Sequence, residues 1–158
     1  MIFKQLFEAD SSTYTYLVGR RDSGKALLID PVLDTVERHL QVLRDLDMTL
    51  TMTLETHIHA DHLTGAQYIK SRIGGTVAIG EGIRQVQAHF GPVFNLGKEF
   101  ASDGHQFDRL FSDGDTFTIG GLECEVIATP GHTNDSVSYR IGSAVFVGDS
   151  MFMPDFGT

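Results

Sequence analysis

The stretch from Leu54 to Gly65, LETHIHADHLTG, constrains the fold of this chain more than any other part of its sequence. Residues 57–62 pack three histidines and an aspartate into six consecutive positions. A surface helix or a core strand has no use for so many imidazoles, whereas neutral imidazole and carboxylate are common metal ligands. We interpret the stretch as part of a metal site. Neighbouring residues cannot surround an ion, so the fold has to bring further ligands from elsewhere.

The histidines follow residues 50–56, LTMTLET, which are typical of a β-strand. His57 and His59 are separated by one residue, so both point to one face if the strand continues, and two imidazoles can then reach one ion. Asp61 and His62 turn into the next loop or helix. There they offer a second set of ligands close to the first.

The bulk composition predicts a globular enzyme in one domain, residues 1–158. A net charge of −9 argues against non-specific nucleic-acid binding, which needs clustered Lys and Arg. Cys124 is the only cysteine, so no intrachain disulfide can form. We find no stretch suited to a signal peptide or a bilayer span, and we therefore expect a cytoplasmic location and no membrane partner.

Alternating and helical patterns predict a mixed α/β fold in layers. We expect strands at 2–7, 13–19, 25–31, 50–56 and 76–80, then a meander of strands over 116–131, 136–142 and 143–149. Helices are expected at 35–46 and 64–73, and residues 81–111 predict only a helix plus a long loop. His39 falls in the first helix, where we expect it on the surface. Cys124 alternates with apolar neighbours and is expected in the core.

Three further polar residues stand where a predicted strand ends. His132 follows the strand at 122–129, after the turn Pro130-Gly131, and Asp149 follows an apolar strand and Gly148. Ligands from different strand ends can meet at one sheet edge. Asp30 ends a third strand, in LLIDP, where it either orients a ligand histidine or simply forms the turn before Pro31.

The segments LIDP, THIHADH, TPGHT and VGD, in this order, resemble the metallo-β-lactamase superfamily over nearly the whole chain. The resemblance implies that superfamily's αββα sandwich, of which this chain holds mainly the N-terminal half plus the following strands. SSTYTYLV, ALLIDPV and LETHIHADHLTGA look most like the persulfide dioxygenase (sulfur dioxygenase) branch. FDRLFSDGDTF and GDSMFMPDFGT are similar to the bacterial β-lactamase-like hydrolases of that branch.

The resemblance implies two alternative metal sites. In the hydrolases, including glyoxalase II, the matching residues His57, His59 and His132 hold one zinc ion. Asp61 and His62 hold a second ion, Asp149 bridges the two, and a C-terminal histidine completes the set. A hydroxide between the ions then attacks a thioester or ester, which makes Asp61 and His62 catalytic.

In persulfide dioxygenases the matching residues His57, His132 and Asp149 hold one Fe(II) per chain and leave three positions open. The outer sulfur of a thiol persulfide, usually that of glutathione, is oxidised by O₂ to sulfite. His59, Asp61 and His62 then bond to the ligands or to water. Ala60 favours this reading, because glyoxalase II relatives usually carry a bulky aromatic residue there.

The resembling families continue beyond Thr158 by about half a domain, so we expect a C-terminally truncated domain. The second sheet and its helices would then be missing, which would leave an apolar face uncovered. We expect a homo-oligomer, in the simplest case a dimer. A function of another class also stays open, in which the chain is a non-catalytic metal-binding fragment completed by a partner chain.

Overall fold

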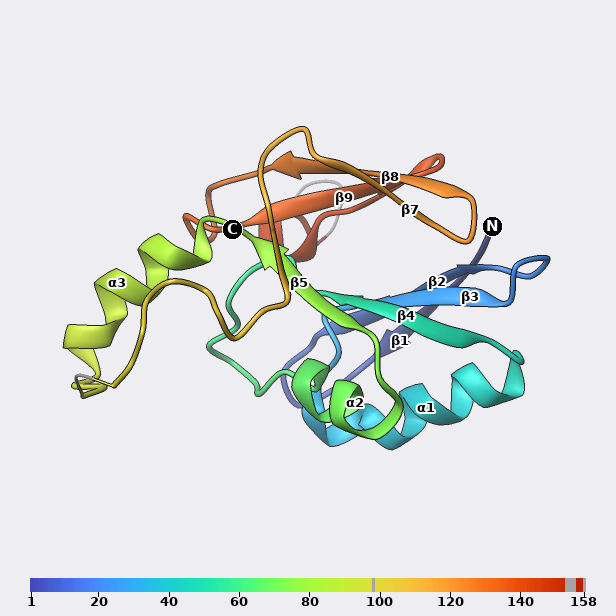
Figure 1. The fold of residues 1–158 in the computed structure, drawn as a ribbon, viewed down its shortest axis with the longest axis horizontal. Coiled ribbons are helices and arrows are strands. Elements are labelled where there is room, and N and C mark those ends of the chain that lie inside the picture. Colours follow the sequence, from blue (N-terminus) through green and yellow to red (C-terminus); the bar gives the residue numbers. More distant parts are fainter. Residues whose placement is uncertain (98, 153–155, 158) are drawn as a thin grey trace.

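The computed structural model describes residues 1–97, 99–152 and 156–157, and Figure 1 shows its ribbon. Within these residues, one sheet contains six strands in the order β1-β2-β3-β4-β5-β6. Its strands β1 to β3 are antiparallel, and β3 to β6 are parallel. The bounds are β1 (Ile2–Phe7), β2 (Tyr14–Arg20), β3 (Lys25–Ile29), β4 (Thr49–Leu54), β5 (Thr76–Gly80) and β6 (Arg109–Phe111).

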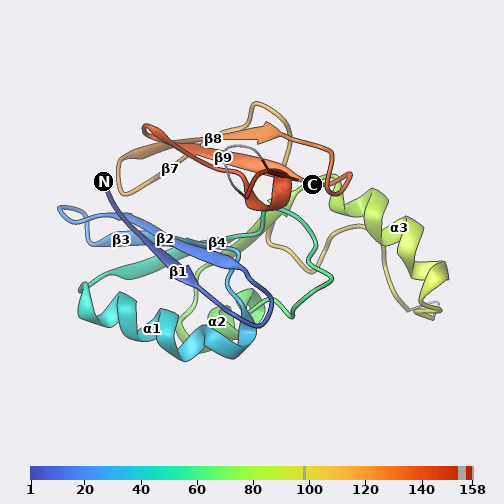
Figure 2. The same cartoon turned by 180° about the vertical axis from the view of Figure 1, so that it is seen from behind.

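A second, antiparallel sheet of four strands follows in the chain, in the order β10-β9-β8-β7. Its strands are β7 (Thr116–Ile119), β8 (Leu122–Ala128), β9 (Val137–Ile141) and β10 (Ala144–Phe146). The two sheets lie face to face in both views (Figures 1 and 2). The strands expected from the alternating pattern are confirmed, although β3, β4 and β10 end earlier than predicted, at Ile29, Leu54 and Phe146.

The main core lies between the sheets. One sheet supplies residues such as Leu27, Ile29 and Leu54, and the other supplies Val126 and Tyr139, all at most 1% exposed. Burying one such aliphatic side chain contributes about 1.5–3 kcal/mol. The close packing of these faces fixes the distance between the strand ends of the two sheets.

Two helices cover the other face of the six-stranded sheet: α1 (Val36–Asp45) and α2 (Ala66–Ile73) (Figure 1). Leu40 and Leu43 of α1 and Ile69 of α2 pack on residues such as Leu28. The prediction that His39 lies on the surface is wrong, because its side chain is fully buried on α1. Cys124 is buried, as predicted.

The third helix, α3 (Ile83–Val93), leans away from both sheets, and the segment after it runs back to β6 (Figure 1). Residues 81–111 therefore contain a helix, a long connection and the short strand β6. None of the helices in the described ranges has the length and apolar character required to cross a bilayer.

The expectation that the second sheet is missing is wrong, since four of its strands are present. Its outward side chains are largely polar or charged, for example Thr118, Glu123 and Arg140. The expectation of an uncovered apolar face is also wrong for the six-stranded sheet, because the second sheet packs on that face. Among the described residues no helix lies on the outer face of the four-stranded sheet, so three layers of the expected αββα sandwich are seen, in the order α, β, β (Figures 1 and 2).

Candidate metal centre

The end of β4 leads directly into the histidine cluster, and His57 is its most enclosed histidine at 2% exposed. Three hydrogen bonds hold the backbone of residues 55–58, two of them from strand β9 and one from the connection just before it. Tyr139 Oη donates to the carbonyl of Glu55 over 2.7 Å, and Val137 N donates to that of Thr56 over 2.8 Å. Asp135 Oδ2 accepts from Ile58 N over 3.0 Å. The cluster is thus fixed by both sheets.

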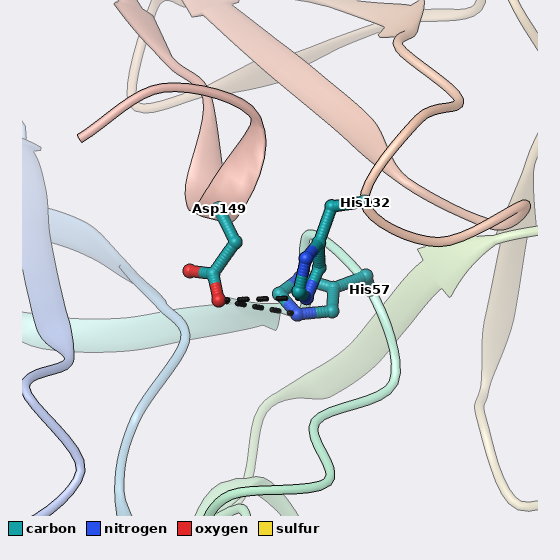
Figure 3. A group of neighbouring side chains, drawn as sticks. All are labelled: His57, His132 and Asp149. Atoms are coloured by element: carbon teal, nitrogen blue, oxygen red, sulfur yellow. Dashed lines mark ion pairs between the residues drawn. The ribbon is translucent and has the colours of Figure 1, made fainter. Parts of the chain in front are cut away.

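His57, His132 and Asp149 converge on one point from three different connections (Figure 3). His132 lies in the turn after β8, and Asp149 lies in a short 3₁₀ helix, Gly148–Ser150, after β10. Asp149 Oδ2 is 3.9 Å from His57 Nε2 and 3.5 Å from His132 Nε2. One ligand atom from each residue lies within 4.8 Å of the others, so two nitrogens and one oxygen can share an ion.

Thr56 determines which nitrogen of His57 faces this point. The Thr56 hydroxyl donates to Asp30 Oδ2 over 2.8 Å, and it lies 2.9 Å from His57 Nδ1. A hydroxyl has one hydrogen to donate, so its oxygen accepts from a protonated Nδ1. The lone pair of His57 is therefore on Nε2, which points toward Asp149. Burial and the nearby His59 lower the pKa of His57, which favours the neutral, ligating imidazole.

His59 has different neighbours, although its ring lies 4.1 Å from that of His57. Its Nε2 is 3.3 Å from Asp30 Oδ1 and 3.5 Å from Glu55 Oε2. Burial opposes protonation, but the bonds to these two carboxylates outweigh it and raise the pKa of His59 to about 11. Burial raises the pKa of Glu55 to about 7. Burial also opposes ionisation of Asp30, yet its bond with His59 lowers the pKa of this carboxyl.

Asp61 and His62 lie on the outer side of the same loop. With His59 they form a second group whose ligand atoms lie within 4.8 Å of one another, and His59 Nδ1 is 4.0 Å from Asp61 Oδ1. The structure therefore divides the predicted residues. His57, His132 and Asp149 form one group, while His59 joins Asp61 and His62 on one side and Asp30 on the other.

The sequence analysis did not single out Glu55, Thr56 or Asp135. Because the strand ends at Leu54, His57 and His59 do not share one strand face, and His59 turns toward the two buried carboxylates. One signal was available: Glu55 is an acidic residue directly after an apolar strand, four positions before His59. A buried carboxylate of that kind needs a cationic or hydrogen-bonding partner.

Comparisons with known proteins show to which family the chain belongs. Residues 9–158 match the Metallo-beta-lactamase superfamily. The chain is 42% identical to Glyoxylase B2 of Dictyostelium discoideum, over 96% of the chain and 56% of that protein. It is 34% identical to the mitochondrial persulfide dioxygenase ETHE1 of Bos taurus, over 99% of the chain and 55% of that protein.

Among solved structures, the crystal structure of ETHE1 from Myxococcus xanthus superimposes with a TM-score of 0.78 at 40% identity. It covers 99% of this chain and 63% of the other. The chain therefore spans between 55% and 63% of the length of these relatives.

Proposed function

Because the chain belongs to the metallo-β-lactamase superfamily, we propose that it carries the metal centre of an iron-dependent persulfide dioxygenase. In the proposed reaction the outer sulfur of a thiol persulfide is oxidised by O₂. One persulfide, one O₂ and one water give sulfite, two protons and the free thiol, which keeps the inner sulfur. The observation that carries the proposal is the convergence of His57, His132 and Asp149.

The donor set fits a single Fe(II). Two imidazoles and one carboxylate on one side of the ion are the ligands of many non-haem iron oxygenases. When bound, such an ion offers open positions at which a sulfur compound and O₂ can meet. The side chains of His132 and Asp149 are each 30% exposed, whereas His57 is buried beneath them, so the centre opens on the side of these two residues.

The surrounding residues orient the three ligands. Thr56 donates two hydrogen bonds to the carboxylate of Asp30, one from its backbone N–H and one from its hydroxyl. The same hydroxyl bonds to Nδ1 of His57. The Nε2 of His59 is already shared by Asp30 and Glu55. This contact leaves His59 outside the group of three and supports a centre with one ion.

The names of two relatives also support the proposal. The bovine relative and the Myxococcus structure are both ETHE1 proteins, and the former is named a persulfide dioxygenase. Their lengths exceed that of this chain, so the proposal concerns the metal centre and its reaction type.

A second candidate function is hydrolysis of a thioester by two metal ions. The observation that favours it is the group His59, Asp61 and His62, whose ligand atoms also lie within 4.8 Å of one another. The Dictyostelium relative, named a glyoxylase, points the same way. In this alternative His59 turns from Asp30 to an ion, and zinc replaces iron.

Oxygen uptake tests the proposal directly. The protein is loaded with Fe(II) without oxygen, mixed with glutathione persulfide, and followed with an oxygen electrode and a sulfite assay. We expect one O₂ consumed and one sulfite formed per persulfide. His105→Ala serves as a control, because His105 is exposed and bonds to Asp103. Rapid hydrolysis of S-lactoylglutathione without oxygen uptake contradicts the proposal and favours the two-ion alternative.

A further inference from the structure

A cavity of about 560 Å³ lies between α2, α3 and the segment that returns from α3 to β6. We call it the α3 cavity. Its walls include Val86 and Phe90 of α3, Phe100 and Phe107 of the returning segment, and Val77 of β5. The volume lies in the range of pockets that bind small molecules.

The walls are apolar. Among the described lining residues the only titratable side chain is His59, whose Nε2 is already bonded to Asp30 and Glu55, and the other polar ones are a threonine and three glutamines. Glutathione carries two carboxylates and an ammonium group, which require charged or strongly polar partners when they leave water. The cavity therefore suits an uncharged hydrocarbon chain and not the glutathione tripeptide.

The glutamines of the α3 cavity are occupied in holding its walls together. Gln67 Nε2 donates to the Gln106 carbonyl over 2.5 Å, and Gln87 Nε2 donates to Gln106 Oε1 over 2.9 Å. Gln87 Oε1 accepts from Gly104 N over 3.0 Å. These bonds tie the returning segment to α2 and α3. They also leave Gln87 with few hydrogen bonds to offer a polar ligand.

The α3 cavity adjoins the candidate metal centre. Ile58, His59 and Ala60 form part of its wall, and the ring of His59 lies 4.1 Å from that of His57. Ala60 has the smallest side chain among residues 57–62. A larger side chain at this position would fill part of the cavity that Ala60 lines. His57, His132 and Asp149 do not line the cavity, so its connection with the candidate metal centre runs through His59 and Ala60.

Phe90 is 42% exposed although it lines the cavity. Exposed aromatic groups around a cavity keep apolar surface in contact with water, which an apolar ligand relieves. The cavity wall includes His59, which also belongs to a candidate metal-binding group, and on this ground we take the ligand to be part of the reacting molecule.

We propose that the α3 cavity binds an uncharged alkyl or acyl chain attached to the reacting sulfur, so that the substrates include persulfides or thioesters of apolar thiols. This inference rests on the proposed function for its link to sulfur chemistry. Binding of an apolar chain in the cavity does not depend on turnover and can be measured separately.

Binding is measured by ligand-detected NMR titration of the purified protein with 1-butanol, 1-hexanol and 1-octanol. Each buried methylene contributes about 0.8 kcal/mol, which corresponds to a decrease of about fourfold in Kd. Val86→Glu places a carboxylate in the cavity and is expected to weaken octanol binding by at least about tenfold. Val93→Glu is the matched control: Val93 is on the same helix, is 64% exposed and does not line the cavity.

A Kd that does not change with chain length overturns the inference, as does equal binding by Val86→Glu and Val93→Glu. A second experiment measures oxygen uptake with hexyl persulfide and with ethyl persulfide. We expect a higher kcat/KM for the hexyl compound. Chain-length-dependent alcohol binding without oxygen uptake from any persulfide overturns the proposed function and supports the cavity assignment.

Discussion

The hydroxyl of Thr56 connects a buried carboxylate to a candidate metal ligand. It bonds to Asp30 and His57 at once, and it therefore places the lone pair of His57 on Nε2. Residues that orient a ligand in this way typically change metal affinity by about 10–100-fold when they are replaced.

Thr56→Val removes this hydroxyl while keeping the shape of the side chain. We expect iron affinity to fall by about 10–100-fold, because Nδ1 of His57 loses the acceptor that fixes its tautomer. A competition titration with a chelator measures the change. Thr56→Ser is expected to restore affinity, and Thr51→Val is the control, since the Thr51 hydroxyl bonds to Ala26 O on the same sheet. Unchanged affinity in Thr56→Val contradicts the assignment.

Metal content distinguishes one ion from two. His57→Ala and Asp149→Ala are expected to lose iron, because each removes one of the three converging ligands. His62→Ala is expected to keep most of it, because His62 belongs to the outer group. Iron and zinc per chain are measured by inductively coupled plasma mass spectrometry. Equal losses in all three variants support the two-ion alternative.

His39 predicts a pH dependence of stability. Burial, followed by the charge of Arg38, lowers its pKa to about 4 in the folded protein, against 6.5 in the unfolded chain. The unfolded chain therefore binds the proton first as pH falls. The stabilising contribution is complete above about pH 6.5 and is lost between 6.5 and 4, with a total of about 3 kcal/mol.

Urea unfolding at pH 7 and pH 4.5 measures this effect. We expect the free energy of unfolding to fall by about 2.5 kcal/mol more in the wild type than in His39→Leu, which has no proton to bind. The comparison between the two proteins cancels the titration of the other histidines. Parallel pH profiles of the two proteins rule out this role of His39.

At the scale of elements, the centre is assembled by connections between strands and not by the strands themselves. β4, β8 and β10 each end three or four residues before a candidate ligand. Gly148 allows the last of these connections to approach the first: its φ is +51°, and a Cβ built on it lies 2.8 Å from Thr56 Cβ.

Gly148→Ala is expected to destabilise the protein and to weaken metal binding together. The left-handed backbone costs about 1 kcal/mol with alanine, and the clash with Thr56 adds about 1–3 kcal/mol. Gly114→Ala is the control, because Gly114 also has a positive φ, +79°, but nothing lies within 4 Å of its added Cβ. Thermal unfolding and iron titration measure both effects. Equal losses in the two variants contradict the close approach.

Much of the fold could be predicted because alternation and helical periodicity report which face of an element is buried. The same pattern places His57, His132 and Asp149 at strand ends, where the alternation stops. The contacts of Glu55 and Thr56 could not be predicted, because they depend on how the chain turns after β4. The burial of His39 was missed because one polar residue on a helix is compatible with either face.

At the scale of the whole molecule, the ligands join the two sheets. His57 belongs to the end of the six-stranded sheet, and His132 and Asp149 belong to connections of the four-stranded one. An ion held by all three residues would therefore bridge the interface between the sheets, and it would stabilise only the folded state.

Removal of the metal is expected to lower the melting temperature. At free metal about a hundredfold above its Kd, binding contributes about 2.7 kcal/mol, or about 5–10 °C for a chain of this size. Calorimetry with and without a chelator measures the shift. Asp149→Ala is expected to melt at the same temperature in both conditions. A shift that persists in this variant places the stabilising ion elsewhere.

The order of the ligands along the chain has a consequence for assembly. His57 precedes His132 and Asp149 by 75 and 92 positions, so the three side chains meet only after both sheets have formed. Closing such long loops is slow and cannot be the first event in folding. A metal ion held by all three residues is therefore expected to bind after both sheets have formed. The metal-free chain is then expected to be a folded precursor that can still take up its ion.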